Sequence, residues 1–178
     1  DLAVTYISDA LEFNGKLNLD LDKGAMVMAQ LDHIRYGRND VAMLYHTAPD
    51  APILSVKGKA FDYAMLASEG DAMTISDFPA VKMDLDVDSL YLPKDQVMQK
   101  VKGTINCGRV RCESANLAAA FAKGGDMTLK IYREGATRKF LMQSNNAGSL
   151  LQTFDITDRM FEGSLDLSGA YDDSKQGN

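Results

Sequence analysis

The sequence predicts a mainly β fold, in which an antiparallel meander sheet curves into a groove or folds over as a sandwich, with two or three short helices. Three observations lead to this prediction. Apolar and polar residues alternate with period two in many segments, which is typical of strands with one buried and one wet face. Turn-forming residues recur about every ten positions. Few segments show the 3.6-residue period of an amphipathic helix.

The alternation is clearest in three segments that share leucine, valine or methionine on one side and Asp, Asn or Ser on the other: Lys16 to Asp22, Val81 to Asp88, and Ser164 to Ser168. Weaker alternation predicts further strands at Ala25 to Ile34, Val41 to His46, Ile53 to Lys57, Val97 to Cys107 and Met127 to Tyr132. The predicted turns between strands are Asn14-Gly15, Asp22 to Gly24, Tyr36 to Asp40, Pro49 to Pro52, Gly124 to Asp126 and Glu134-Gly135. Together they predict eight to ten strands.

Helices are expected at only two or three places. Phe61 to Ser68 precedes Gly70, and Ala147 to Phe154 follows Asn145 and Asn146, either of which can cap a helix. Ser114 to Lys123 has a possible cap, four alanines and a terminal Gly124, but it also continues the alternation of Val110 and Cys112, so helix and strand are equally compatible with it.

This shortage of helix matters for the apolar side of the sheet. An apolar sheet face must be buried against a second sheet, against helices or against a ligand. Two helices of about eight residues cannot cover eight or more strands. The sequence therefore favours either a closed sandwich, which is the more general outcome, or a trough whose interior is open to an apolar guest.

Composition and charge limit the function. The chain has 178 residues, of which 46% are apolar, and a formal charge of −6. It is long enough for one globular unit, residues 1–178, with a possible sub-boundary near 70–80. The acidity argues against a nucleic-acid partner and against charge-driven adhesion to anionic headgroups. No segment has the roughly 20 apolar residues that a membrane-spanning helix requires. The first residue is not Met, and the chain is expected to be a segment of something longer.

No residue pattern indicates catalysis or a metal, so we expect a non-enzymatic protein without a cofactor. His33 and His46 lie in or beside predicted strands and have no partner motif. Asp84, Asp86 and Asp88 imitate the start of a calcium loop, but Ser89 stands where Gly is needed and Asp95 where Glu is needed. These aspartates fit the solvated face of a strand better.

The two cysteines, Cys107 and Cys112, are five positions apart, which places them on opposite faces of an uninterrupted strand. Two buried free thiols are therefore the first expectation. A bend at Gly108 would instead permit a disulfide, and the sequence does not decide between the two states.

Several segments resemble the large AsmA-like envelope proteins of the alphaproteobacterial type. Arg35 to Asp40 is similar to an Arg-x-Gly-x-x-Asp turn of that family. Ser55 to Asp62 is similar to a family segment in which a strand is followed by a Gly and then by an Asp. The segment from Leu141 to Leu165 is the most similar, as a strand, a small helix and a strand led by Gly163; it departs from the family pattern at Asn146, where Asp is common, and at Glu162, where a second Gly is common.

The resemblance implies a periplasmic β-groove, attached to the inner membrane through a segment that is absent here, which binds phospholipid or another acyl lipid or transfers it between the inner and outer membranes. The alternative is a scaffolding or interaction domain with envelope protein partners in outer-membrane biogenesis. The candidate groove residues share the apolar side of the alternating segments: Leu17, Leu19, Leu21, Met83, Leu85, Val87, Val101, Ile105, Leu165 and Leu167.

Overall fold

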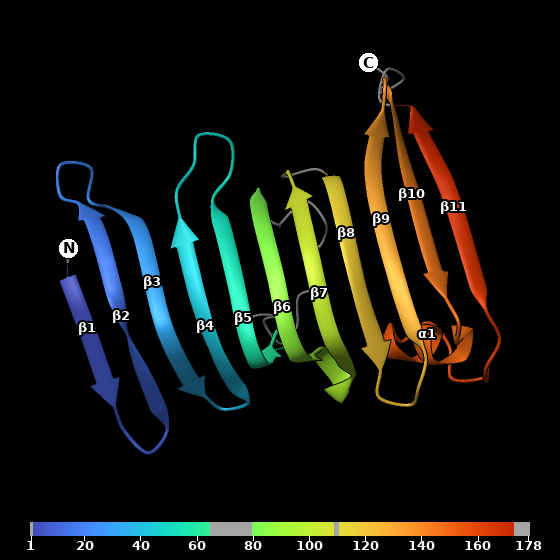
Figure 1. Ribbon diagram of the computed structural model, residues 1–178, viewed down its shortest axis with the longest axis horizontal. Coiled ribbons are helices and arrows are strands. Elements are labelled where there is room, and N and C mark those ends of the chain that lie inside the picture. The colour runs from blue at the N-terminus through green and yellow to red at the C-terminus, as the bar shows by residue number, and fades with distance from the viewer. Residues whose placement is uncertain (1, 65–79, 109–110, 173–178) are drawn as a thin grey trace.

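The structure, a computed structural model, describes residues 2–64, 80–108 and 111–172, and it consists of one eleven-stranded sheet with a short helix at one end (Figure 1). The order of the strands in the sheet is their order in the chain. Their bounds are β1 (Leu2–Ile7), β2 (Leu11–Asp20), β3 (Ala25–Tyr36), β4 (Asn39–His46), β5 (Ile53–Asp62), β6 (Val81–Tyr91), β7 (Val97–Cys107), β8 (Cys112–Phe121), β9 (Asp126–Glu134), β10 (Thr137–Ser144) and β11 (Leu165–Asp172).

The predicted mainly β class and curved meander are confirmed. Each strand pairs with its neighbour in the chain, and every pair is antiparallel except β5 with β6, which is parallel. The parallel pair corrects the expectation of a wholly antiparallel sheet. Parallel strands need a connection of a dozen or more residues, and the chain between Asp62 and Val81 is long enough to supply it.

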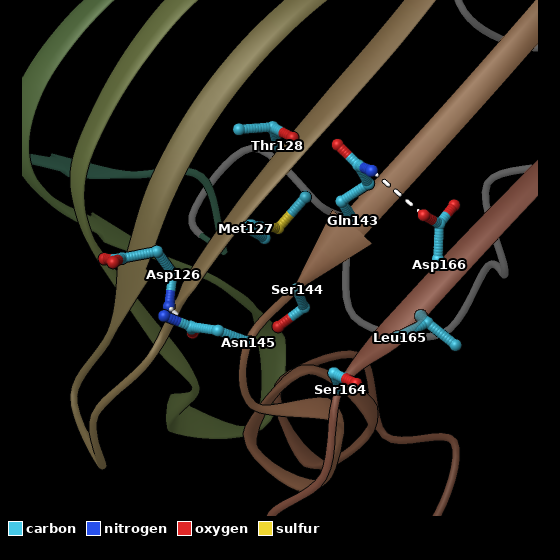
Figure 2. A pocket seen from close by; sticks show the side chains of 9 residues that line it. All are labelled: Asp126, Met127, Thr128, Gln143, Ser144, Asn145, Ser164, Leu165 and Asp166. Carbon is cyan, nitrogen blue, oxygen red and sulfur yellow. Dashed lines mark hydrogen bonds between the residues drawn. The ribbon is translucent and has the colours of Figure 1, made fainter.

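The described strands form a single layer, so the sandwich alternative is not what the described residues adopt. α1 (Ala147–Thr153) lies at the end of the sheet near β8 to β10 and contributes Leu150 to the core. The core is centred on Val56, Leu85, Val87 and Val101, which are buried in the middle strands. The strands bend along their length, as Figure 2 shows for the part of the sheet near α1.

Two glycines explain where neighbouring strands come close. Asn14-Gly15 was expected to be a turn, but both residues lie inside β2, at a register shift against β3. A Cβ added at Gly15 would lie 2.1 Å from the carbonyl oxygen of Gln30. At Gly103 of β7, where φ is +145°, an added Cβ would lie 1.9 Å from the carbonyl oxygen of Asn116. Only glycine fits at such approaches, which bend a sheet.

The helix predictions had mixed outcomes. The helix at Ala147 is confirmed, and the Asn146 Oδ1 caps it by accepting a hydrogen bond from the Ser149 N–H over 2.9 Å. The undecided segment from Ser114 to Lys123 is a strand, since it supplies most of β8.

The predicted helix from Phe61 is wrong at its start, because Phe61 and Asp62 pair with β6 as the end of β5. Residues 65–68 of that prediction, and most of the possible sub-boundary near 70–80, lie outside the described residues. A single turn of 3-10 helix, η2 (Pro93–Asp95), joins β6 to β7.

Cys107 and Cys112 form a disulfide, which corrects the expectation of two free thiols. The two residues are direct partners in the β7–β8 ladder, and the Gly108 N–H donates to the Arg111 carbonyl oxygen over 2.8 Å. The chain therefore reverses between them, and they no longer belong to one continuous strand. The bridge closes the β7–β8 hairpin covalently.

Candidate functional site

One face of the sheet carries a continuous apolar row that crosses all eleven strands. Each member of this row is the direct ladder partner of the next, so the row has no break from one edge to the other. From β1 to β11 it consists of Val4, Gly15, Leu31, Met43, Val56, Leu85, Gly103, Leu117, Leu129, Met142 and Leu167. At about 4.8 Å between strands, the row spans roughly 48 Å.

Two further rows flank it on the same face, because side chains two positions apart in a strand point the same way. One contains Leu2, Leu17, Met83, Ile105 and Phe140. These residues are direct ladder partners or are joined by ladder partners in the strands between them. The other contains Val87 and Val101, which are direct partners, and at its far end Leu165. We call the three rows together the apolar face.

The apolar face brings together eight of the ten candidate groove residues: Leu17, Met83, Leu85, Val87, Val101, Ile105, Leu165 and Leu167. Leu19 lies near the end of β2, two positions beyond Leu17, and is largely exposed. Leu21 is the exception. The expected strand from Lys16 to Asp22 ends at Asp20, so Leu21 lies in the following turn and is 86% exposed. Asp20 ends the strand because its Oδ1 accepts hydrogen bonds from the backbone N–H groups of Asp22 and Lys23.

The opposite face is predominantly polar. Between two of the apolar rows, the ladder partners on this side are Ala3, Lys16, Gln30, Leu44, Ser55, Asp84, Thr104, Asn116, Lys130, Leu141 and Ser168. Asp84, Asp86 and Asp88 lie on this polar face, as the alternation predicted. Lysines of the neighbouring strands pair with two of them: Lys102 Nζ is 2.9 Å from Asp86 and Lys57 Nζ is 3.7 Å from Asp84. The hydrogen bond from Lys102 to Asp86 raises the pKa of the lysine.

Accessibility differs along the apolar face. In the central strands Val56, Leu85, Val87 and Val101 are buried. Towards the two edges the side chains are more exposed to solvent: Leu2 on β1 is 52% exposed, and Leu167 on β11 is 46% exposed. An apolar ligand therefore meets accessible surface first on the flanks of the sheet.

At one end of the apolar face, a charged cluster ties the β3–β4 turn to the end of β5. The Arg38 Nε donates to the Asp62 Oδ2 over 2.8 Å, and its Nη1 to the Asp95 Oδ1 over 3.1 Å. The guanidinium lies 4.5 Å from the centre of the Tyr91 ring. These carboxylates, Asp62 first, raise the pKa of Arg38. Arg38 and Asp62 both belong to the segments on which the family resemblance rests, although no sequence pattern indicated that they pair.

At the other end, three arginines surround Glu113. The Arg111 Nε and the Arg133 Nη2 lie 3.2 Å and 2.8 Å from the two Glu113 oxygens, and the Arg138 Nη2 lies 3.8 Å away. Burial works to raise the pKa of Glu113, but the three arginines outweigh it and hold the pKa below its usual range. Sequence reasoning missed this group, which we call the arginine cluster, because its members come from different strands.

A hollow of about 410 Å³ lies over β9, β10 and β11 (Figure 2). Thr128, Gln143 and Asp166 are ladder partners on the polar face, and the Gln143 Nε2 donates to the Asp166 Oδ2 over 3.0 Å. The hollow is also lined by Met127 and by Leu165 of the apolar face, so its lining combines residues of both faces.

Each of the two histidines has a polar neighbour. His33 Nε2 lies 3.1 Å from Asp40 Oδ1, and His46 Nδ1 lies 3.3 Å from its neighbour's carbonyl oxygen, that of Thr47. Within the part of the chain that the structure describes, no three His, Cys, Asp or Glu side chains are grouped so that they could hold a metal ion. None of the helices among those residues has the length and apolar character needed to traverse a bilayer.

In comparisons with known proteins, no protein-family model, no curated protein and no solved structure matches the chain.

Proposed function

We propose that this protein is a non-enzymatic lipid-binding module, which holds the acyl chains of a phospholipid against its apolar face. The observation that carries the proposal is the unbroken apolar row across eleven strands, over which the described residues place a single short helix at one end. Burying an acyl chain on such a surface yields about 0.8 kcal/mol per CH2. The polar opposite face keeps the module in water.

The proposal extends to place and role through the AsmA-like resemblance. On that reading the module works in the periplasm as part of a longer protein attached to the inner membrane, and the apolar face passes lipid between the two membranes of the envelope. The disulfide between Cys107 and Cys112 supports an oxidising compartment such as the periplasm.

Lipid extraction and native mass spectrometry of the purified chain test the proposal. The chain should carry acyl lipid in a stoichiometric amount. Leu167→Lys places a charge on the exposed flank of the apolar face and should reduce the bound lipid several-fold, because a charge opposes burial against hydrocarbon. Leu44→Lys is the matched control, since Leu44 is 38% exposed but lies on the polar face.

Both variants should unfold at temperatures close to that of the parent chain, because neither leucine is buried. A parent chain that carries no acyl lipid, or a Leu44→Lys variant that loses as much lipid as Leu167→Lys, contradicts the proposal.

A second candidate function, a scaffold that binds an envelope protein, is favoured by one specific feature. The edge strand β1 (Leu2–Ile7) contains neither charge nor proline and has one free edge among the described strands. Such an edge can accept a strand from another protein. Cross-linking from β1 to a protein partner, with no lipid bound, would favour this function over lipid binding.

A further inference from the structure

The arginine cluster lies on the same face as the apolar rows. Arg133 is two positions from Ile131 in β9, and Arg138 is two positions from Phe140 in β10, so both arginines point to the apolar side. Arg133 and Arg138 are direct ladder partners. They stand immediately beyond the row that contains Ile131 and Phe140, which are also partners. The cluster therefore borders the apolar face directly.

The surroundings hold the arginines in place. Arg138 is one of the few buried charged residues, with its side chain 10% exposed, and its guanidinium lies 6.0 Å from the centre of the Tyr171 ring. Arg111 lies in the disulfide-closed turn of the β7–β8 hairpin and reaches Glu113. Glu113 thus draws side chains from β9 and β10 and from the β7–β8 turn to one point.

The chemistry of this arrangement fits a phosphate group. Each guanidinium has five N–H donors in a planar fork that matches phosphate oxygens, and the two oxygens of Glu113 can accept only part of what three guanidinium groups offer. A phosphate would share these donors with Glu113 and with the other partners that the arginines already have. An amphiphile with its phosphate at the cluster would have its acyl chains beside Ile131 and Phe140.

We propose that the arginine cluster binds the phosphate of an anionic phospholipid whose acyl chains lie on the apolar face. This inference rests on the proposed lipid-binding function and adds its headgroup class and orientation. The headgroup stays at the rim of the face, and the chains run from the rim across the apolar rows. The whole chain has a formal charge of −6, so the arginine cluster supplies the local positive charge that attracts an anionic headgroup.

The test compares lipid loading from two kinds of vesicle, one of phosphatidylcholine alone and one of phosphatidylcholine mixed with phosphatidic acid, with native mass spectrometry as the readout. The parent chain should take up phosphatidic acid in preference to phosphatidylcholine. Arg133→Met should reduce that preference about tenfold, since hydrogen bonds to charged groups are strong enough for such a factor. Arg133→Lys should fall between the two, because lysine keeps the charge but loses the bidentate geometry.

Lys130→Met is the matched control. Lys130 lies on the polar face of the same strand, so the variant has the same charge change as Arg133→Met and should keep the preference. Equal losses in both variants, or an unchanged preference in Arg133→Met, overturn the headgroup site. Arg133 is about half-exposed, and thermal unfolding will show that its variants remain folded.

Two outcomes separate this inference from the function on which it rests. If the parent chain loads both lipids without preference, the headgroup site is wrong and the lipid-binding function stands. If it loads neither lipid, the function itself is wrong. Titration with inorganic phosphate distinguishes the source of the phosphate: should inorganic phosphate displace phosphatidic acid at equal concentration, the cluster is a site for the free ion and the lipid assignment is overturned.

Discussion

The ion pair between Arg38 and Asp62 involves a buried carboxylate. Asp62 is 3% exposed, its Oδ1 has no hydrogen-bond partner, and its Oδ2 depends on Arg38. Replacing the arginine would leave the buried Asp62 carboxylate without its charged partner. This costs far more folding free energy than the loss of a surface ion pair. Arg38 itself is 41% exposed, but its partner is buried, so we expect Arg38→Ala to lower the urea midpoint of unfolding clearly below that of the parent chain.

Arg35→Ala provides the control for this prediction. Arg35 is also an arginine near the β3–β4 turn, but its partner Glu12 is 3.7 Å away and both side chains are well exposed. Exposed pairs contribute about 0–1 kcal/mol, so this variant should unfold close to the parent chain. Equal effects of the two substitutions would show that Asp62 does not depend on Arg38.

Glu113 gives a prediction for pH. Its folded pKa lies below the ordinary value of 4.5, so its stabilising effect is complete above that pH and disappears as the pH falls through the folded pKa. Glu113→Gln removes the charge that the arginines surround, and it should lower the melting temperature at pH 7. As the pH falls below 4.5 and through the folded pKa, the parent glutamate becomes protonated, and the difference in melting temperature should shrink. A difference that stays constant across this range would contradict the assignment.

At the level of elements, α1 depends on its cap. The Asn146 Oδ1 accepts from the Ser149 N–H, and the Asn146 Nδ2 donates to the Gly124 carbonyl oxygen. We expect Asn146→Ala to lower the free energy of unfolding by about 1 kcal/mol, the usual cost of losing an N-cap, as measured by thermal or urea unfolding. Asn146→Asp keeps the accepting oxygen and should lose less. Equal losses would indicate that the bond to Gly124 matters more than the cap.

The sequence could predict elements whose local signals agree with their pairing, and it failed where pairing overrode local preference. The helix after Asn146 has a cap and leucines at helical spacing, so it was predictable. In β8, by contrast, alanines suggested helix, but Ala115, Leu117 and Ala119 also form a period-two series whose partners in β9 are Ile131, Leu129 and Met127. A ladder of this kind fixes the strand state, and no local propensity reveals it.

For the whole molecule, eight of the ten groove candidates that the sequence indicated lie on the apolar face, but neither charged cluster was indicated. Alternation assigns a side chain to a face without knowledge of its neighbours, which is why Met83, Leu85 and Leu167 were predictable. The arginine cluster requires Glu113 to meet Arg133 from the next strand, and that depends on the register of the sheet and on the disulfide-closed turn. Register follows from all strands together, so single segments could not show it.

The free edges of the sheet lead to a prediction about self-association. Natural sheets protect their edges with charge, proline or a bulge, and β1 (Leu2–Ile7) has neither charge nor proline. The two edge strands, β1 and β11, run in opposite directions (Figure 1), so β11 of one copy could pair with β1 of another in an antiparallel ladder that continues the apolar face. Such head-to-tail contacts do not close into a ring, and they produce open-ended assemblies.

We therefore expect the purified chain to associate in a concentration-dependent manner in analytical ultracentrifugation. Thr5→Lys places a charge on this edge and should shift the distribution towards the monomer, whereas Thr104→Lys, the same change on the polar face of the central strand β7, should not. A parent chain that stays monomeric at all concentrations would show that these edges are not open to a second copy.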